Sequence, residues 1–273
     1  MRLNRRIMIN RKKYFIYDEY TANLCKLASN ATTTKELAKL CQRMYLADYV
    51  NLEGIDLWLA KNAMTAVFQV LRDYPALRRR MHYFGTLNGF ITRKDDLIDF
   101  LYPDGGDYER DFIKNAATAT AESAAESFSQ SGLAMAFFAE CENVSFSGIL
   151  IDETDFDKKS VLNNLAYDEA SGFSPRGCHS LRSVITHELG HMLDFWLGIS
   201  ECSSFRKKLE NLSSSYIQKN LSLYSASGGE ADSHEVIAEG FAEYRCSKAP
   251  RELATFVGTL IDEKYNGSVT EDD

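Results

Sequence analysis

Residues 184–198 read VITHELGHMLDFWLG, and this stretch decides the fold of the second half of the chain. Its apolar residues have the spacing of a buried helix, so we predict a helix over about residues 179–197. Gly198 stands where glycine commonly ends a helix, because glycine adopts the left-handed conformation without strain. The stretch is therefore expected to be a packed helix that carries a few polar side chains.

The polar side chains of this helix include an HExxH string, formed by His187, Glu188 and His191. Side chains four residues apart stand one above the other, so both imidazoles can bind one zinc ion at about 2.0–2.1 Å. Glu188 then lies beside the open coordination position, where it can take a proton from metal-bound water and pass it to the leaving amine. Such a string arises by chance on the order of once in a hundred chains of this size, which favours a metal site.

A catalytic zinc site needs a third protein ligand while one position stays open for water. Glu235 and Glu239 are four residues apart in the run EVIAEGFAEY, whose apolar spacing predicts a second packed helix over about residues 232–246. One carboxylate can bind zinc while the other accepts a hydrogen bond from the second nitrogen of a ligand histidine. The residues alone leave open which glutamate has which role.

The run ITHELGHMLDFWLG, followed by Leu223, Tyr224 and EVIAEGFAEY, resembles the catalytic domain of anthrax lethal factor and its relatives, which are gluzincins. The similarity covers roughly residues 140–265. It implies that Glu235 is the third zinc ligand, that Glu239 lies in the outer shell, and that Tyr224 hydrogen-bonds the oxyanion of the tetrahedral intermediate. The helical N-terminal part is similar instead to peptidases of prophages and mobile elements, so no mitogen-kinase-kinase substrate is implied.

Several nearby residues have two interpretations each. Asp194 either orients a zinc ligand or pairs with another charge on the surface. Cys178 and His179 are interpreted as a buried thiol and a residue near the helix start, rather than as groups that gate the zinc. His234 points to a different helix face from the proposed ligand, so we expect a neighbour and not a ligand. Gly148 either lets a substrate backbone approach an edge strand or is structural.

The rest of the chain is predicted to be helical before residue 80 and mixed after it. A helix over about residues 56–73 should end before Pro75, because the proline ring disfavours helical geometry in the residue that precedes it. Short apolar runs then indicate a small sheet over residues 81–86 and 97–102, and an antiparallel pair over 133–138 and 146–151. Residues 116–127 fit a helix or a flexible segment, and helices are expected over about 203–219 and 250–264.

Composition excludes several classes of protein. A chain of 273 residues with 45% hydrophobic residues can bury a substantial core, which excludes general disorder. The net charge of −8 argues against a nucleic-acid binder, because phosphate neutralisation needs a surplus of Lys and Arg. No window approaches the roughly 18 apolar residues of a membrane span, and no signal-peptide core is present. The six cysteines form no CxxC pair and are interpreted as reduced thiols, consistent with synthesis in the cytoplasm and with phage-associated or non-classical export.

These observations combine into one prediction of an α+β, zincin-like metallopeptidase fold. Residues 1–53 form a helical N-terminal extension, and residues 54–273 form the peptidase domain, with a small mixed or antiparallel sheet over the active-site helix. The expected function is a zinc-dependent endopeptidase with one zinc ion per chain, whose peptide or protein substrate binds extended along an edge strand. The alternative is a zinc-bound but proteolytically silent or latent module that binds partners in a phage or mobile-element assembly.

Overall fold

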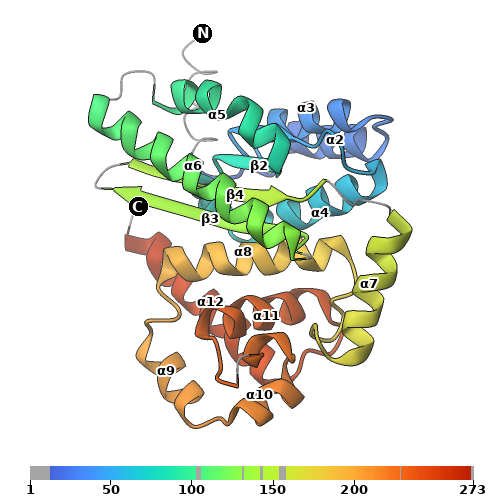
Figure 1. Ribbon diagram of the computed structural model, residues 1–273, viewed down its shortest axis with the longest axis vertical. Coiled ribbons are helices and arrows are strands. Elements are labelled where there is room, and N and C mark those ends of the chain that lie inside the picture. The colour runs from blue at the N-terminus through green and yellow to red at the C-terminus, as the bar shows by residue number, and fades with distance from the viewer. Residues whose placement is uncertain are drawn as a thin grey trace. The chain divides into compact units, whose positions relative to one another are not determined.

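The chain forms two compact units, Met1–Phe156 and Asp157–Asp273, which we call the sheet unit and the helical unit. The computed structural model describes residues 13–102, 106–130, 132–141, 144–153, 158–227 and 229–271. In Figure 1 the sheet unit runs from blue to yellow-green and the helical unit from yellow to red. The described residues are mostly helical and include one small sheet, so the predicted α+β class is confirmed.

The sheet has four strands in the order β1-β2-β4-β3. They are β1 (Tyr49–Asn51), β2 (Tyr83–Thr86), β3 (Ala134–Cys141) and β4 (Val144–Ile151). Strand β2 pairs in parallel with β1 and with β4, whereas β3 and β4 form an antiparallel pair. This antiparallel pair confirms the one predicted over residues 133–138 and 146–151, and the expected connecting residues 142 and 143 lie outside the described residues.

Gly148 is a structural glycine in the interior of this sheet. Strand β4 is paired on both sides, and the Cα partners of Gly148 are Tyr83 on β2 and Phe137 on β3. A Cβ atom at Gly148 would stand 2.1 Å from the carbonyl oxygen of Tyr83, which leaves no room for any other residue. Of the two interpretations of Gly148, the structural one therefore holds, and an approach of substrate to an edge strand at this residue is excluded, because β1 and β3 are the edges of the described sheet.

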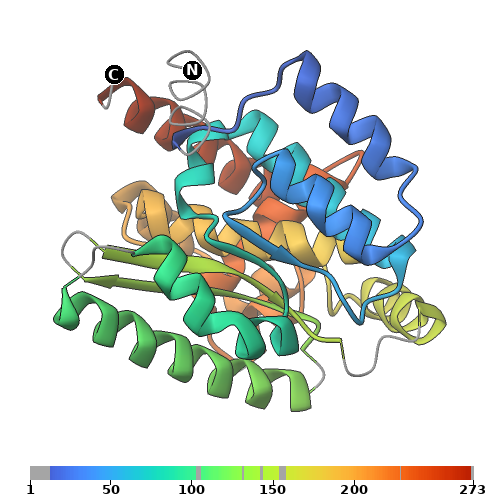
Figure 2. The same cartoon turned by 90° about the horizontal axis from the view of Figure 1, so that it is seen from above.

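Two helices, α5 (Leu87–Leu101) and α6 (Asp107–Ser129), pack against the sheet and against each other, as Figure 2 shows in green. The core between them is apolar and largely aromatic; it includes Tyr83, Phe90, Ile98, Ile113, Phe137 and Phe146. The prediction of a strand over residues 97–102 is wrong. Phe90 and Leu97 are buried on one helical face two turns apart, which a short apolar run could not reveal. The undecided residues 116–127 belong to α6.

The N-terminal part of the sheet unit consists of α2 (Glu19–Ser29), α3 (Thr34–Arg43), α4 (Leu57–Asp73) and the 3-10 helix η1 (Pro75–Arg80). Each α-helix begins with a side chain that accepts a backbone N–H, from Asp18, Thr33 and Asp56 respectively. The helix predicted over residues 56–73 is confirmed. The predicted division between residues 53 and 54 falls inside this unit, where β1 pairs with β2 across it.

The described part of the helical unit is built from helices. They are α7 (Lys158–Ser171), α8 (Leu181–Leu197), α9 (Ser203–Glu210), α10 (Ser214–Asn220), η2 (Tyr224–Ala226), α11 (Ser233–Cys246) and α12 (Glu252–Glu271). Helix α11 packs against both α8 and α12 (Figure 1). Gly198 ends α8 with φ of 61°, as predicted, whereas the helix predicted over 203–219 is two helices, α9 and α10. None of the described helices is long and apolar enough to cross a membrane.

Candidate metal centre

Helices α8 and α11 run antiparallel, which brings the HExxH string opposite the glutamate pair. His187 contacts Glu239, and His191, one turn further along α8, faces Glu235, one turn earlier on α11. Because residue numbers rise along one helix as they fall along the other, the two motifs meet turn by turn. The sequence places the two histidines on one face of α8 and the two glutamates on one face of α11. The packing of the two helices brings these faces into contact.

Gly190 allows this close approach. It lies on α8 between the two histidines and packs against α11. A Cβ atom at this position would stand 2.9 Å from the Cα of Ala238 and 3.3 Å from the Cβ of Phe241. The absent side chain thus sets the separation of the two helices, and with it the distance from the histidines to the glutamates.

Three side chains converge with geometry suited to one metal ion. The Nε2 atoms of His187 and His191 are 3.0 Å apart. The carboxylate of Glu235 lies 3.3 Å from the first nitrogen through Oε2 and 3.6 Å from the second through Oε1. Two nitrogens bound to one tetrahedral metal ion at about 2.0–2.1 Å stand roughly 3.4 Å apart, so these separations are close to those of three ligands around one ion.

Glu239 orients one of the histidines. Its Oε1 lies 2.9 Å from Nδ1 of His187, and its side chain is only 7% exposed. With Nδ1–H donating to this carboxylate, Nε2 of His187 carries the free lone pair and faces the other ligand atoms. Glu235 therefore lies against the Nε2 atoms of both histidines and Glu239 against the far side of His187, a difference that the spacing of the two glutamates could not show.

Two carboxylate oxygens test whether these residues fit a metal ion. Oε2 of Glu235 and Oε2 of Glu239 are buried and have no hydrogen-bond partner among the described residues. A buried acceptor without a partner costs about 1–3 kcal/mol, and more when it is charged. A cation between the three side chains would contact the Glu235 oxygen, so the donor set fits a divalent ion.

The electrostatics of the cluster also favour positive charge. Burial by itself lowers the pKa of His187, but the adjacent carboxylates of Glu235 and Glu239 outweigh it, so this pKa lies well above its usual value. Burial likewise raises the pKa of Glu235, yet the adjacent imidazoles of His187 and His191 bring it below the usual range. Because carboxylates surround the imidazoles, a cation between the helices is stabilised.

Glu188 and Tyr224 lie next to this cluster. The side chain of Glu188 is on α8 and nearly buried, and its charge raises the pKa of His187. The ring centroid of Tyr224 lies 6.1 Å from that of His187. Burial, and then the negative charges of Glu235 and Glu188, raise the pKa of the Tyr224 hydroxyl, so this hydroxyl stays protonated and can donate a hydrogen bond.

Tyr224 is held in place by the segment that follows α7. Its backbone N–H donates to the carbonyl of Phe173 at 3.2 Å, and the N–H of Leu223 donates to that of Gly172 at 2.8 Å. The ring of Phe173 packs against that of Tyr224 with centroids 5.4 Å apart and is 41% exposed. Phe173 is thus an exposed aromatic beside the cluster that the sequence analysis missed, because it belongs to no motif.

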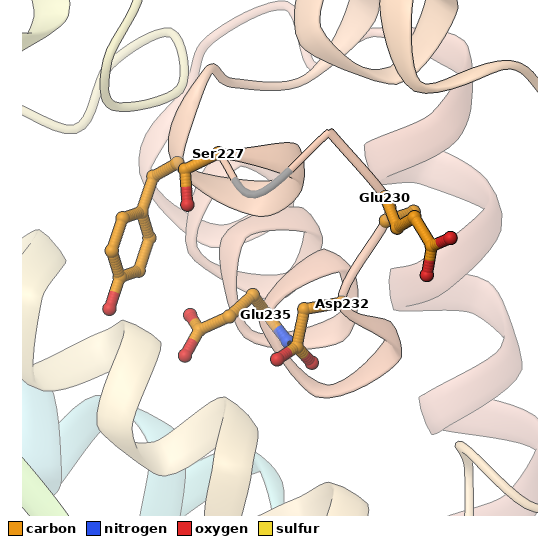
Figure 3. A pocket seen from close by; sticks show the side chains of 6 residues that line it. Ser227, Glu230, Asp232 and Glu235 are labelled. Atoms are coloured by element: carbon orange, nitrogen blue, oxygen red, sulfur yellow. Dashed lines mark hydrogen bonds between the residues drawn. The ribbon is translucent and has the colours of Figure 1, made fainter.

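A cavity of about 470 Å³ opens beside Glu235. Its lining is strongly polar and consists of Tyr224, Ser227, Glu230, Ala231, Asp232 and Glu235. Figure 3 shows that the carboxylates of Glu235 and Glu230 lie on different sides of Asp232, which begins α11. Space for a ligand therefore adjoins Glu235 and Tyr224 directly.

Asp194 and His234 contact each other. Asp194 is 1% exposed, so the surface ion pair considered for it is excluded. Its Oδ2 lies 2.6 Å from Nδ1 of His234, and its Oδ1 accepts a hydrogen bond from the N–H of Ser200 at 2.7 Å. The carboxylate thus binds the histidine beside Glu235 rather than a ligand histidine, and His234 is a neighbour of the ligands.

The residues ahead of α8 make contacts of their own. Cys178 is buried, and its thiol hydrogen-bonds that of Cys246, the last residue of α11, which raises the pKa of Cys178. His179 is exposed and lies 2.8 Å from Glu169, whose carboxylate also accepts the N–H of Gly177. Cys178 is therefore a buried thiol, as predicted, but it has a sulfur partner that no spacing indicated.

Comparison with known proteins adds no further information, since no protein-family model, no curated protein and no solved structure matches the chain. The chemistry of the cluster therefore has to be inferred from its own geometry.

Proposed function

We propose that the helical unit carries the centre of a zinc-dependent endopeptidase of the gluzincin type in a zincin-like fold. The observation that carries the proposal is the convergence of one ligand atom each from His187, His191 and Glu235, all within 4.8 Å of one another. Three protein ligands leave a fourth position for water or substrate, which is the arrangement of catalytic rather than structural zinc sites.

The residues around the ligands support hydrolysis. A zinc ion held there would supply Lewis acidity, polarising a carbonyl and making water easier to deprotonate near neutral pH. Glu188 lies on the same helix beside the ligands and is the group to accept a proton from the attacking water and to deliver it to the leaving amine. Tyr224, with its protonated hydroxyl, is the group to donate to the oxyanion.

The substrate we propose is a peptide or protein bound in an extended conformation. Zincin peptidases bind such substrates as an added strand at a sheet edge. The described sheet has two edges, β1 and β3, and an added strand can pair with either. The placement of the active-site helix beneath the sheet stays a prediction.

The test combines metal analysis with peptide cleavage. We expect purified wild-type protein to contain one zinc ion per chain by elemental analysis and Glu235→Ala to lose most of it. Glu188→Gln should keep its zinc while cleavage of a random peptide library falls by about 10²–10⁴-fold, the usual contribution of a general base.

The outcomes separate the two functions considered. Zinc-loaded wild type that cleaves no peptide would support a silent or latent partner-binding module instead. Wild type that takes up no zinc when zinc is supplied would contradict both. Equal cleavage by wild type and Glu188→Gln would remove Glu188 from the mechanism.

A further inference from the structure

We propose that Asp194 and His234 form a clamp that positions Glu235 for metal binding. This inference rests on the proposed metal centre, and it assigns His234 a positioning role that neither the motif nor the ligand set contains. The clamp joins α8, three residues beyond His191, to α11, one residue ahead of Glu235.

Asp194 is a rigid anchor for this clamp. Its carboxylate is 1% exposed, and its Oδ1 is fixed by the N–H of Ser200 just beyond the end of α8. Its Oδ2 accepts a hydrogen bond from Nδ1–H of His234 at 2.6 Å, within the short range of hydrogen bonds to charged acceptors. Because the acceptor is buried, water competes poorly for it, and the position of the imidazole is well defined.

The clamp acts where α11 is otherwise least restrained. Glu235 is the third residue of the helix, and the first turn of a helix lacks the backbone hydrogen bonds that hold its interior. Asp232 caps this turn by accepting the N–H groups of His234 and Glu235 at 2.9 Å and 3.3 Å. On one side the turn faces the cavity, so it lacks tight packing there.

The middle of α11 is held in place by packing and needs no additional hydrogen bond of this kind. Gly190 and Ala238 hold the two helices together at close range, and Glu239 there is 7% exposed. The ligand that lies toward the open end is Glu235, with 22% of its side chain exposed. Packing restrains the middle of α11, around Ala238 and Glu239. The clamp restrains Glu235, the one proposed ligand in the first turn of the helix.

His234 itself adds little to the core. Its side chain is 63% exposed, so replacing it removes little buried apolar surface. Loss of the clamp should accordingly change the placement of Glu235 more than the stability of the fold. A change in metal affinity and in coordination geometry, without a matching change in stability, is the signature of a positioning role.

The experiment compares His234→Leu, which removes the donor, with His234→Asn, whose amide nitrogen replaces Nδ1. The matched control is His179→Leu, because His179 is also exposed and paired with a carboxylate, but precedes α8 and contacts Glu169 instead of a residue beside Glu235. Zinc affinity is measured by competition with a chromogenic chelator, and coordination by the visible absorption of the cobalt-substituted protein. Thermal unfolding with EDTA present reports on the metal-free fold.

We expect His234→Leu to bind zinc about 10–100-fold more weakly, the range found when a group that orients a metal ligand is removed. Its cobalt spectrum should change, and its metal-free unfolding temperature should stay close to that of wild type. His234→Asn should recover most of the affinity, and His179→Leu should match wild type in every measurement.

Unchanged zinc affinity and an unchanged cobalt spectrum in His234→Leu would overturn the clamp. So would a loss of affinity that His234→Asn fails to recover, since the Nδ1 donor would then be irrelevant. Wild type that binds zinc but cleaves no peptide would contradict the proposed function and leave this test valid. Wild type that binds no metal would overturn both.

Discussion

Two histidines, the buried His82 in the sheet unit and the largely buried His187 in the helical unit, have opposite pKa shifts. Burial lowers the pKa of His82 in the sheet unit to about 4, and the charges of Arg78 and Arg80 act in the same direction. Burial also lowers the pKa of His187 in the helical unit, but the adjacent carboxylates of Glu235 and Glu239 raise it well above its usual value. The surroundings thus favour the neutral imidazole of His82 in one unit and the protonated imidazole of His187 in the other.

The difference lies in how the surrounding charges are matched. Near His82, Arg78 pairs with Asp48 at 2.7 Å, and Nδ1 of His82 accepts the N–H of Ser147 at 3.0 Å. Near His187, carboxylates outnumber cations, and two of their oxygens lack hydrogen-bond partners among the described residues. A buried histidine by itself therefore does not indicate a metal site, whereas an excess of carboxylates around it favours the binding of a cation.

The largest effect should come from zinc itself. At a zinc concentration of a thousand times Kd, the free energy of unfolding should rise by about 4 kcal/mol, because only the folded chain assembles the ligands. His82→Asn should keep this gain and His187→Gln should lose most of it, as urea unfolding with zinc or with EDTA would measure. An equal gain in His187→Gln would mean that zinc binds elsewhere.

The next effect is a loss of stability in acid that depends on His82. The unfolded chain protonates this histidine near pH 6.5, whereas the folded protein holds it neutral down to about pH 4. The stability from the neutral form is therefore complete above pH 6.5 and is lost as pH falls toward 4, by about 3 kcal/mol.

Urea unfolding of the metal-free protein at pH 7 and pH 4.5 would measure this loss. His82→Asn keeps an acceptor for the N–H of Ser147 but does not titrate, so its loss over the same interval should be smaller than that of wild type by most of this amount. Identical pH dependence in the two proteins would show that His82 titrates normally in the folded state.

A third effect should follow from Glu239→Gln. The amide can still contact Nδ1 of His187 but no longer carries the charge that orients the imidazole, so zinc affinity should fall by about 10–100-fold. Glu230→Gln is the matched control, since Glu230 lines the same cavity but lies apart from the ligands (Figure 3). Chelator competition measures both, and equal losses would mean that overall charge, and not orientation, sets the affinity.

The smallest effect concerns the spacing of the two helices. Gly190→Ala places a methyl group against Ala238 and should cost about 1–3 kcal/mol of stability while weakening zinc binding. Gly267→Ala on α12 meets no atom within 4 Å and should stabilise the protein by about 0.5–1 kcal/mol. Denaturant unfolding would compare the two variants. A Gly190→Ala protein with unchanged stability and zinc affinity would show that the close approach of α8 and α11 is not required.

Much of the secondary structure could be predicted because long helices repeat their apolar residues many times. The helices around the HExxH string and the glutamate pair have several buried turns and were found from their spacing. Helix α7 was missed because it buries only Val161 and Leu165. Residues 97–102 were assigned to a strand because a run of a few apolar residues fits a buried face of either kind.

The sequence by itself determined which side chains share one face of one helix. His187 with His191, and Glu235 with Glu239, follow from the fixed rotation of a helix, which is local geometry. The tertiary structure alone decided which residues of different helices touch. Such contacts depend on how the helices pack, and a local sequence pattern carries no information about residues far apart in the chain. It set the approach of Glu235 to both histidines, the contact of Asp194 with His234 forty residues away, and the exposed ring of Phe173 beside Tyr224.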